Sequence, residues 1–556
     1  FWPKALYGFM TPKFILFQVL VEIVFGAWII LLVYKKGFAR IIADLRKNYI
    51  SLALLGFLVI SFISAFFGVD FGRSFWGIGA RMTGLFAELH FFAWFLVLIS
   101  ISKSDFGKLL KSDFDMVRYL NFSFAVSILV ALSAFFQNTQ WRLVYGSTFF
   151  NNPTFVAPYL LFHFFWGLYQ IASSKFQVSS FKSWFFGSGT ALLAFVIFLG
   201  EVRGAILGLF IGLVIFGLGL IFTDTIKRRF KILLFAFFVA IFFILAGLWF
   251  ARESAFVQNT SPLKRLTQVS LEQTTVQTRL IAWRLAVGGF KERIWFGAGP
   301  ENFNYVFNAY YNPMLLKYGL GETWFDKPHN AFLQILTEIG AIGSLAYLLI
   351  LIMATFALFK LFKSGQKILA LTLASAFTAY LSSMFFSFDS FGSWFGLFLM
   401  LGFLASHYNN SNQSTELRML LIANTIYSQL ASLATVLGVF ALLFVNYVIW
   451  RANIADADAL RIFSHDQVQG IAYFKKSLDY FTPYKAEYQF DLVASVVGAL
   501  AKNLPIPQLE DNLNFALDRA DKAVKAHPKN AAYYTDMAKL YNILGEKGRN
   551  PEILNQ

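Results

Sequence analysis

The sequence has no cysteine and little charge, and both absences limit what the chain can be. Without cysteine there are no disulfides, no thiolate metal ligands and no cysteine nucleophile. Charged residues make up 14% of the 556 residues and hydrophobic residues 57%, which leaves too little polar surface to cover a soluble core of this size. We therefore expect an all-α, polytopic bundle of membrane helices with lipid as its main solvent.

Apolar runs recur along the chain, and each is long enough to cross a hydrocarbon layer about 30 Å thick. They predict roughly twelve transmembrane helices, because about 20 apolar residues suffice for each crossing. The expected spans lie near 14–34, 49–68, 82–101, 117–136, 154–173, 184–200, 203–222, 232–250, 330–359, 368–388, 391–406 and 421–448. Because the sequence begins with Phe1 rather than Met, we also expect an upstream piece, such as a further helix.

The connections between these spans alternate in charge. One set is rich in Lys and Arg, whereas the other carries only Arg73, Arg81, Arg142 and Arg203 in its short loops. Because basic loops stay in the cytoplasm, the second set, both chain ends and the long 251–329 loop are predicted to lie outside. The net charge of +16 is then explained by the basic loops that keep one side of the bundle in the cytoplasm. We expect membrane lipid rather than nucleic acid as a partner, and a multi-pass place in the inner (cytoplasmic) membrane.

Four regions follow from this pattern. They are N-terminal transmembrane helices over 1–250, a large extracytoplasmic loop over 251–329, C-terminal transmembrane helices over 330–450, and an extracytoplasmic helical domain over 451–556.

The last region contains two similar stretches, 471–499 and 516–545, each reading helix, proline turn, helix. Pro483 in the first matches Pro528 in the second. Small residues at Ala516, Ala520 and Ala523 and the pair Tyr533 and Tyr534 make the second stretch resemble a tetratricopeptide repeat. A domain that only caps the bundle and a module that binds a glycan or protein partner both remain open.

Ionisable residues at the mouths of membrane helices are costly and are therefore functional candidates. Arg203 precedes a helix in which Gly204, Gly208 and Gly212 form a smooth ridge for close helix packing. The plain alternative is an arginine that extends to the interface beside a packing motif. Arg279 is a second candidate, one turn from Trp283 on an amphipathic external helix. That helix could equally serve only to bind lipid headgroups.

The stretch Lys327-Pro328-His329-Asn330 precedes a long apolar run. Pro328 stiffens the approach and Asn330 suits a helix N-cap, so His329 is predicted at the mouth of a transmembrane helix. An inert interfacial histidine is an equally weighted alternative.

Three segments together resemble the core of the O-antigen ligase and polymerase family of bacterial membrane glycosyltransferases. They are VRGAILGLFIGLVIFGLG (202–219), FGAGPENFNYVF (296–307) and KPHNAFLQILTEIGAIGSLAYLLIL (327–351), with weaker echoes in FFNNPTFVAPYLL (149–161) and PKFILFQVLVEI (12–23). The resemblance spans about 200–350. Val202 departs from it, because many relatives have serine before the arginine, and this puts a secondary hydrogen bond in doubt but not Arg203.

The resemblance implies inverting, metal-independent glycosyl transfer, without a cofactor, from an undecaprenyl-pyrophosphate-linked glycan to an acceptor hydroxyl on the outer face of the membrane. Arg203 and Arg279 would neutralise the departing pyrophosphate, with Arg284 a weaker third, because guanidinium groups bind phosphate oxygens in pairs. His329 would accept the proton of the acceptor hydroxyl or orient that hydroxyl.

Other residues have expected binding or structural roles. Arg81 and Arg142 could meet the outer phosphate or sugars of the donor, and Asn330 is a further substrate-binding candidate beside His329. Glu338 is expected to be a buried structural carboxylate.

The acceptor is left open, whether a glycan, a lipid or a protein hydroxyl as in the protein O-oligosaccharyltransferases of the same family. A transporter or flippase for lipid-linked oligosaccharide is a different class, but it predicts repeated halves and ionisable residues at mid-membrane. A structural scaffold would leave the motifs of 251–329 unexplained.

Overall fold

The computed structural model describes residues 5–6, 10–34, 37–101, 115–138, 153–173, 181–260, 263–264, 267, 273–319, 323–408, 425–502, 504, 506 and 508–546. Within these ranges every regular element is a helix. The predicted all-α fold is confirmed.

In the described part of the chain, ten helices are long and apolar enough to cross a membrane. They are α1 (Thr11–Tyr34), α3 (Tyr49–Phe67), α7 (Met116–Asn138), α9 (Pro153–Ser173), α10 (Phe181–Leu199), α11 (Arg203–Phe222), α12 (Arg228–Phe250), α17 (Ala331–Lys363), α18 (Lys367–Met384) and α20 (Thr425–Phe463). The shorter apolar helices α5 (Leu85–Ile101) and α19 (Phe391–Tyr408) complete the bundle. Every expected span overlaps one of these helices, so the chain is a multi-pass membrane protein.

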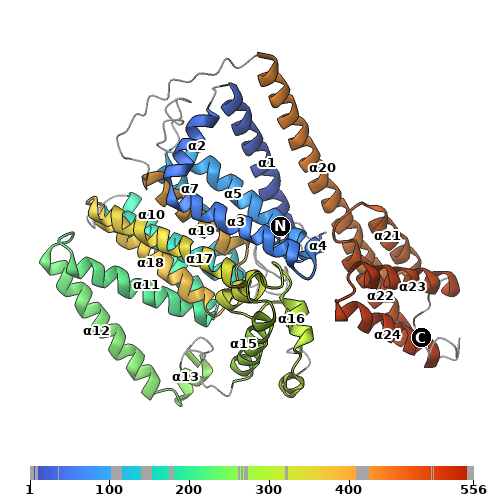
Figure 1. Ribbon diagram of the computed structural model, residues 1–556. Coiled ribbons are helices and arrows are strands. Elements are labelled where there is room, and N and C mark those ends of the chain that lie inside the picture. The colour runs from blue at the N-terminus through green and yellow to red at the C-terminus, as the bar shows by residue number, and fades with distance from the viewer. Residues whose placement is uncertain are drawn as a thin grey trace.

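Short helices occupy the two ends of the bundle. The amphipathic α2 (Phe38–Lys47) lies at one end, and α13 (Ala255–Asn259), α15 (Thr274–Glu292) and α16 (Phe303–Ala309) gather at the other (Figure 1). A 3-10 helix, η1 (Pro313–Tyr318), follows α16. The basic helix α2 and the helices of the long loop thus lie at opposite ends of the bundle.

The glycine ridge of α11 packs along α18. A Cβ atom at Gly208 would lie 2.4 Å from the carbonyl oxygen of Ala379, and one at Gly212 would lie 2.8 Å from that of Ser375. Only glycine allows the two backbones to approach this closely. The ridge therefore fixes the start of α11, where Arg203 lies.

The helix α17 is broken at Gly340, which has φ +76°. The segment before α16 enters this break. The amides of Ala298 and Gly299 donate to the carbonyls of Thr337 (2.9 Å) and Glu338 (2.7 Å). On the far side of the break, the Ala341 amide donates to the carbonyl of residue 294 at 2.7 Å. The FGAGPEN and EIG motifs are therefore hydrogen-bonded to each other.

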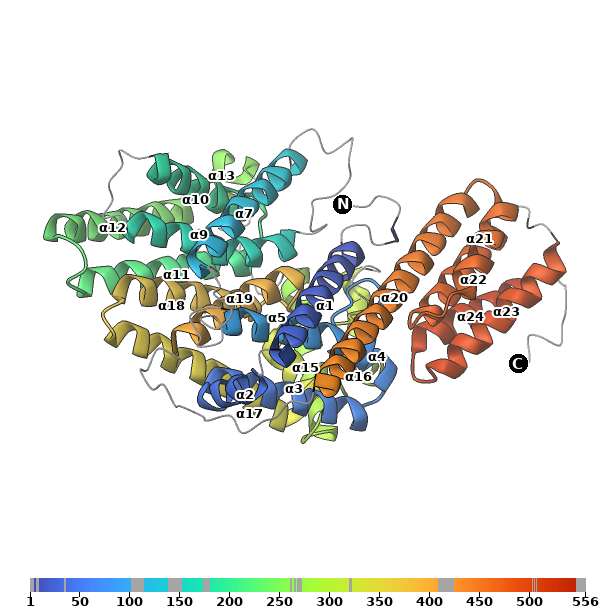
Figure 2. The ribbon, with the colours of Figure 1, turned by 90° about the horizontal axis from the view of Figure 1, so that it is seen from above.

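The C-terminal helices α21 (Gln467–Asp479), α22 (Lys485–Ala501), α23 (Leu509–Ala526) and α24 (Ala531–Glu546) lie where the two predicted hairpins place them. We call residues 467–546 the tail. It stands beside the bundle at the end of α20, which runs without interruption past residue 451 (Figure 2). Its kinship with tetratricopeptide repeats stays a prediction.

The tail and the bundle share one apolar core. Met82, Phe91 and Phe14 from the bundle cluster with buried tail side chains that include Phe474 and Tyr484. The short helix α4 (Phe71–Trp76) and the rest of the α3–α5 connection lie between these two parts.

Candidate active site

Arg203, the first residue of α11, is joined to the helix that carries Arg279. Its Nη1 donates to Oε1 of Gln273 at 2.5 Å, and Gln273 is the residue immediately before α15. Farther along α15, Trp283 Nε1 donates to the carbonyl of Pro328 at 3.0 Å. The helix α15 is thus held to the start of α11 and to the segment that carries His329.

His329 is neutral and has a defined tautomer. Its Nδ1 lies 3.1 Å from the carbonyl oxygen of Lys327, which can only accept, so Nδ1 carries the hydrogen and Nε2 keeps a lone pair. Burial, and then the charge of Arg279, lowers the pKa of His329 to about 4, against an opposing effect of Asp326. Arg279 therefore lies close enough to His329 to act on it electrostatically.

Arg81 reaches the same place from the α3–α5 connection. Its guanidinium lies 3.0 Å from a carboxylate oxygen of Asp326 and 4.4 Å from the ring centroid of Phe388. Phe388 also packs against His329, with ring centroids 5.2 Å apart and an edge-to-face angle of 79°. Arg81 and His329 therefore share a contact with the Phe388 ring.

The structure distributes the remaining predicted residues differently. Asn330 is the N-cap of α17 as predicted, because its Oδ1 accepts from the Leu333 amide at 2.9 Å, and its side chain is buried. Arg284 lies on the exposed side of α15. Arg142 lies outside the described residues. These contacts therefore link the elements that carry Arg203, Arg279, His329 and Arg81.

Strained backbone marks the same region. Among the described residues, positive φ, a conformation that costs non-glycine residues energy, occurs at Met82, Glu201, Glu301 and His329, between +52° and +63°, and at Gln508 in the tail, at +43°. Met82 and Glu201 lie within two residues of Arg81 and Arg203, and His329 is itself a predicted site residue. Such strain persists only where the surroundings fix the backbone, and it often accompanies function.

A buried ion-pair cluster lies beneath His329 and was not assigned from the sequence. Lys327 Nζ is 2.5 Å from Glu301 Oε1 and 3.7 Å from Glu338 Oε1. Thr83 Oγ1 donates to Glu301 at 2.9 Å. Burial would raise the pKa of Glu301, but the Lys327 ammonium and these hydrogen bonds outweigh it and hold the pKa below its usual value.

The expectation that Glu338 is a buried carboxylate is confirmed, since it is 3% exposed. Its partners are Lys327, Gln334 at 3.0 Å and the Phe303 amide at 3.4 Å. The sequence signal that could have found the cluster is the lysine directly before the Pro-His-Asn turn, because a lysine in a buried turn requires a carboxylate.

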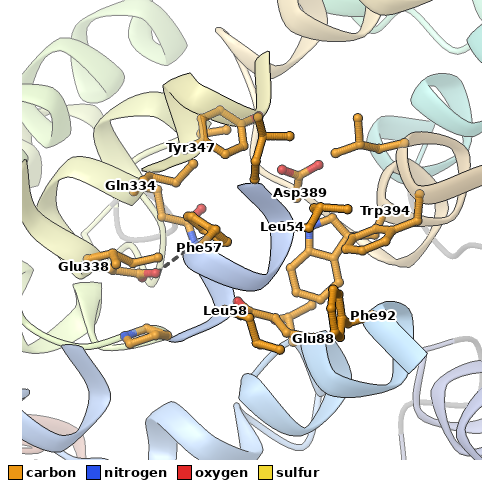
Figure 3. Close-up of a pocket in the computed structure, with 18 of the residues that line it drawn as sticks. Leu54, Phe57, Leu58, Glu88, Phe92, Gln334, Glu338, Tyr347, Asp389 and Trp394 are labelled. Carbon is orange, nitrogen blue, oxygen red and sulfur yellow. Dashed lines mark hydrogen bonds between the residues drawn. The ribbon is translucent and has the colours of Figure 1, made fainter. Parts of the chain in front are cut away.

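A cavity of about 100 Å³ adjoins this cluster. Its walls come from α3, α5, α17 and α19 and are mostly apolar, and Glu88, Glu338 and Asp389 lie around it with Trp394 (Figure 3). Burial raises the pKa of Asp389 to about 6. The arginine side of the site is the part that attracts anions.

The sequence comparisons place a family match over part of the chain. Residues 188–348 match the family model described as O-antigen ligase, a range that includes Arg203, Arg279, Glu301 and His329. No curated protein matches the chain.

Proposed function

We propose that this chain, a membrane protein with an O-antigen ligase domain at residues 188–348, transfers a glycan from an undecaprenyl-pyrophosphate-linked donor to an acceptor hydroxyl. The reaction takes place on the outer face of the cytoplasmic membrane, without a metal, and inverts the anomeric carbon. The family supports membrane glycosyl transfer of the ligase or polymerase type, and the remaining features rest on the site.

The observation that carries the proposal is that His329 is a neutral base within reach of the charge of Arg279. His329 keeps a lone pair on Nε2 because Nδ1–H is taken by the Lys327 carbonyl. The lowered pKa, about 4, keeps the ring neutral at physiological pH. A neutral imidazole beside guanidinium groups can take a proton while those groups hold an anion.

The bond changes balance within the two substrates and His329. The oxygen of the acceptor hydroxyl forms a bond to the anomeric carbon from one face of the sugar. The bond from that carbon to the phosphate oxygen breaks on the opposite face, and its electron pair leaves with the pyrophosphate. The hydroxyl proton passes to Nε2 of His329.

Arg203 and Arg279 bind the pyrophosphate in this proposal, because charge grows on it as the bond lengthens. Each guanidinium stays protonated and offers paired donors to phosphate oxygens. Arg81 binds the outer part of the donor, and Arg284, Arg142 and Asn330 have weaker binding roles. Gln273 keeps Arg203 in place before the donor arrives.

The acceptor is a glycan, a lipid sugar or a protein hydroxyl, and a bulky acceptor suits the tail as an outward-facing module. The tail could also bind a protein partner. The predicted outer segments that carry Arg81, Arg279 and His329 contact one another, which supports placing them on one side of the membrane.

The test uses purified protein in nanodiscs with a synthetic undecaprenyl-pyrophosphate glycan, candidate acceptors and a chelator. Wild-type protein is expected to form the product with inverted anomeric configuration, and His329→Ala and Arg279→Ala are expected to lose it. Arg252→Ala is the control, because Arg252 pairs only locally, with Glu253 at 3.3 Å. A requirement for added divalent metal would overturn the mechanism. Normal rates in both site variants would overturn the site assignment.

A further inference from the structure

The α3–α5 connection is the part of the site held by the tail. We define it as the 70–84 loop, which includes α4. His527 Nδ1 lies 2.6 Å from Asp70 Oδ2, and the Tyr484 hydroxyl donates to the carbonyl of Trp76 at 3.0 Å. The two carboxylate oxygens of Glu487 accept from the Gly79 amide at 3.0 and 3.1 Å.

Gly79 packs too closely against Glu487 and Tyr484 to carry a side chain. A Cβ atom at Gly79 would lie 2.8 Å from Glu487 Oε2 and 3.4 Å from the Tyr484 ring. On its other side, the Gly79 carbonyl accepts from Thr11 Oγ1 at 3.0 Å. Both backbone groups of Gly79 are therefore bonded, and the amide has its partner in the tail.

Arg81 follows Gly79 within one turn. The amides of Arg81 and Met82 both donate to the carbonyl of Ile78, at 3.0 and 2.7 Å. The Met82 side chain is 1% exposed and packs in the core shared with Tyr484. The backbone between these points has little freedom, so the direction of the Arg81 side chain is set by where Gly79 and Met82 are held.

The same loop contacts the site on its other side. Arg81 lies against Asp326 and Phe388, and Thr83 donates to Glu301. Asp70, which binds the tail through His527, also accepts from the Tyr305 hydroxyl at 2.8 Å. The 70–84 loop thus lies between the tail and the residues around His329.

We infer that Glu487, with Tyr484 and His527, is a positioning residue of the active site, and that the tail holds Arg81 in place for the donor. The inference rests on the proposed function of Arg81 in donor binding. The tail is then part of the donor site even though it contributes no residue to it. Loss of the Glu487 contact frees the turn at Gly79 and lets Arg81 leave Phe388.

The test combines kinetics with hydrogen–deuterium exchange. Glu487→Ala is expected to raise KM for the donor about tenfold, as the loss of a buried hydrogen-bond partner implies, while kcat changes less than about twofold on the same grounds. Glu487→Gln keeps an acceptor oxygen and is expected to restore most of the affinity. Glu510→Gln, an exposed tail position, is the matched control and should behave as wild type.

A double-mutant cycle with Arg81→Ala separates positioning from general damage. If Glu487 acts through Arg81, Glu487→Ala adds no further rise in KM to Arg81→Ala. A full additive loss would overturn the inference. Exchange of amides in peptides covering 70–84 should also rise in Glu487→Ala but not in Glu510→Gln. Unchanged exchange there would overturn the positioning role whether or not the wild type transfers glycans, so the two failures are distinguishable.

Discussion

Lys327 and Glu301 form an ion pair, 2.5 Å between Nζ and Oε1, whose side chains are only 3% and 5% exposed. Removal of one partner leaves the other charged and buried, which typically costs about 3–5 kcal/mol. We expect Lys327→Met to lower the free energy of unfolding by about that amount. Thermal unfolding in detergent micelles, followed by tryptophan fluorescence, measures this.

The control for that prediction is an exposed ion pair. Lys522 lies 2.9 Å from Asp518, with both side chains about half exposed, and such pairs contribute about 0–1 kcal/mol. Lys522→Met should therefore unfold almost as the wild type does. If the two variants lost equal free energy of unfolding, the burial of the Lys327 ion pair would not be the cause of the loss.

Acid should weaken the same ion pair. The pKa of Glu301 is lower in the folded protein than in the unfolded chain, so its contribution is fully present above the unfolded pKa and is lost as pH falls through the folded pKa. The melting temperature of the wild type should fall on acidification below about pH 4, near the ordinary glutamate pKa. Glu301→Gln should flatten that dependence, and an unaltered slope would contradict the prediction.

His329 should control the rate and its dependence on acid. Removal of a general base usually costs about 10²–10⁴-fold in rate, so His329→Ala should lower kcat within that range, while the exposed His465→Ala should not. Because burial and Arg279 lower the pKa of His329 to about 4, the ring loses its lone pair only as pH falls through that value. The pH–rate profile of the wild type should stay level from neutral pH to about 5 and decline below it. A decline centred on the ordinary histidine pKa, about 6.5, would refute this.

Lysine should not replace the arginines. Arg203→Lys and Arg279→Lys keep the charge but lose the planar pair of donors, and loss of one such donor typically lowers kcat about 10²–10³-fold. Gln273→Leu should have a smaller effect in the same direction, because in this proposal Gln273 acts by holding Arg203. Initial rates with saturating donor measure all three. Arg252→Lys serves as the comparison, and a charge-only role would appear as near-normal activity in the lysine variants.

The break in α17 should tolerate only glycine. Gly340 and Gly365 both have positive φ, +76° and +90°, but a Cβ at Gly340 would lie 2.4 Å from the Trp295 carbonyl, whereas one at Gly365 would meet nothing within 4 Å. Both alanine variants carry backbone strain of about 1–3 kcal/mol. Gly340→Ala should unfold at a clearly lower temperature than Gly365→Ala, because it alone also separates the two motif segments.

Periodicity, hydropathy and capping chemistry made much of the fold predictable. The membrane spans follow from the runs of apolar residues. The N-cap role of Asn330 follows from its position just before such a run, and the tail helices follow from the amphipathic stretches on either side of Pro483 and Pro528. What could not be predicted is pairing between distant segments. Glu301 and Lys327 are 26 residues apart. The lysine before the Pro-His-Asn turn indicates that a carboxylate is needed, but the local pattern does not say which carboxylate.

The same limit applies to the loops. The backbone bonds between Gly299 and Glu338 depend on a break in α17 that hydropathy does not register, because Gly340 lies within a continuous apolar run. The docking of Glu487 on Gly79 joins residues at opposite ends of the sequence. A glutamate in an amphipathic helix is ordinarily solvent-exposed, so neither residue carried a signal.

The length of α20 has a mechanical consequence. Its 39 residues extend about 58 Å at 1.5 Å per residue, nearly twice the thickness of the hydrocarbon layer, about 30 Å. Asn446, on this helix, donates to Glu22 of α1 at 2.7 Å, so α20 is held to α1 at the edge of the bundle. A force applied to the tail by a large bound molecule would be transmitted along this continuous helix to its contact with α1, at the membrane.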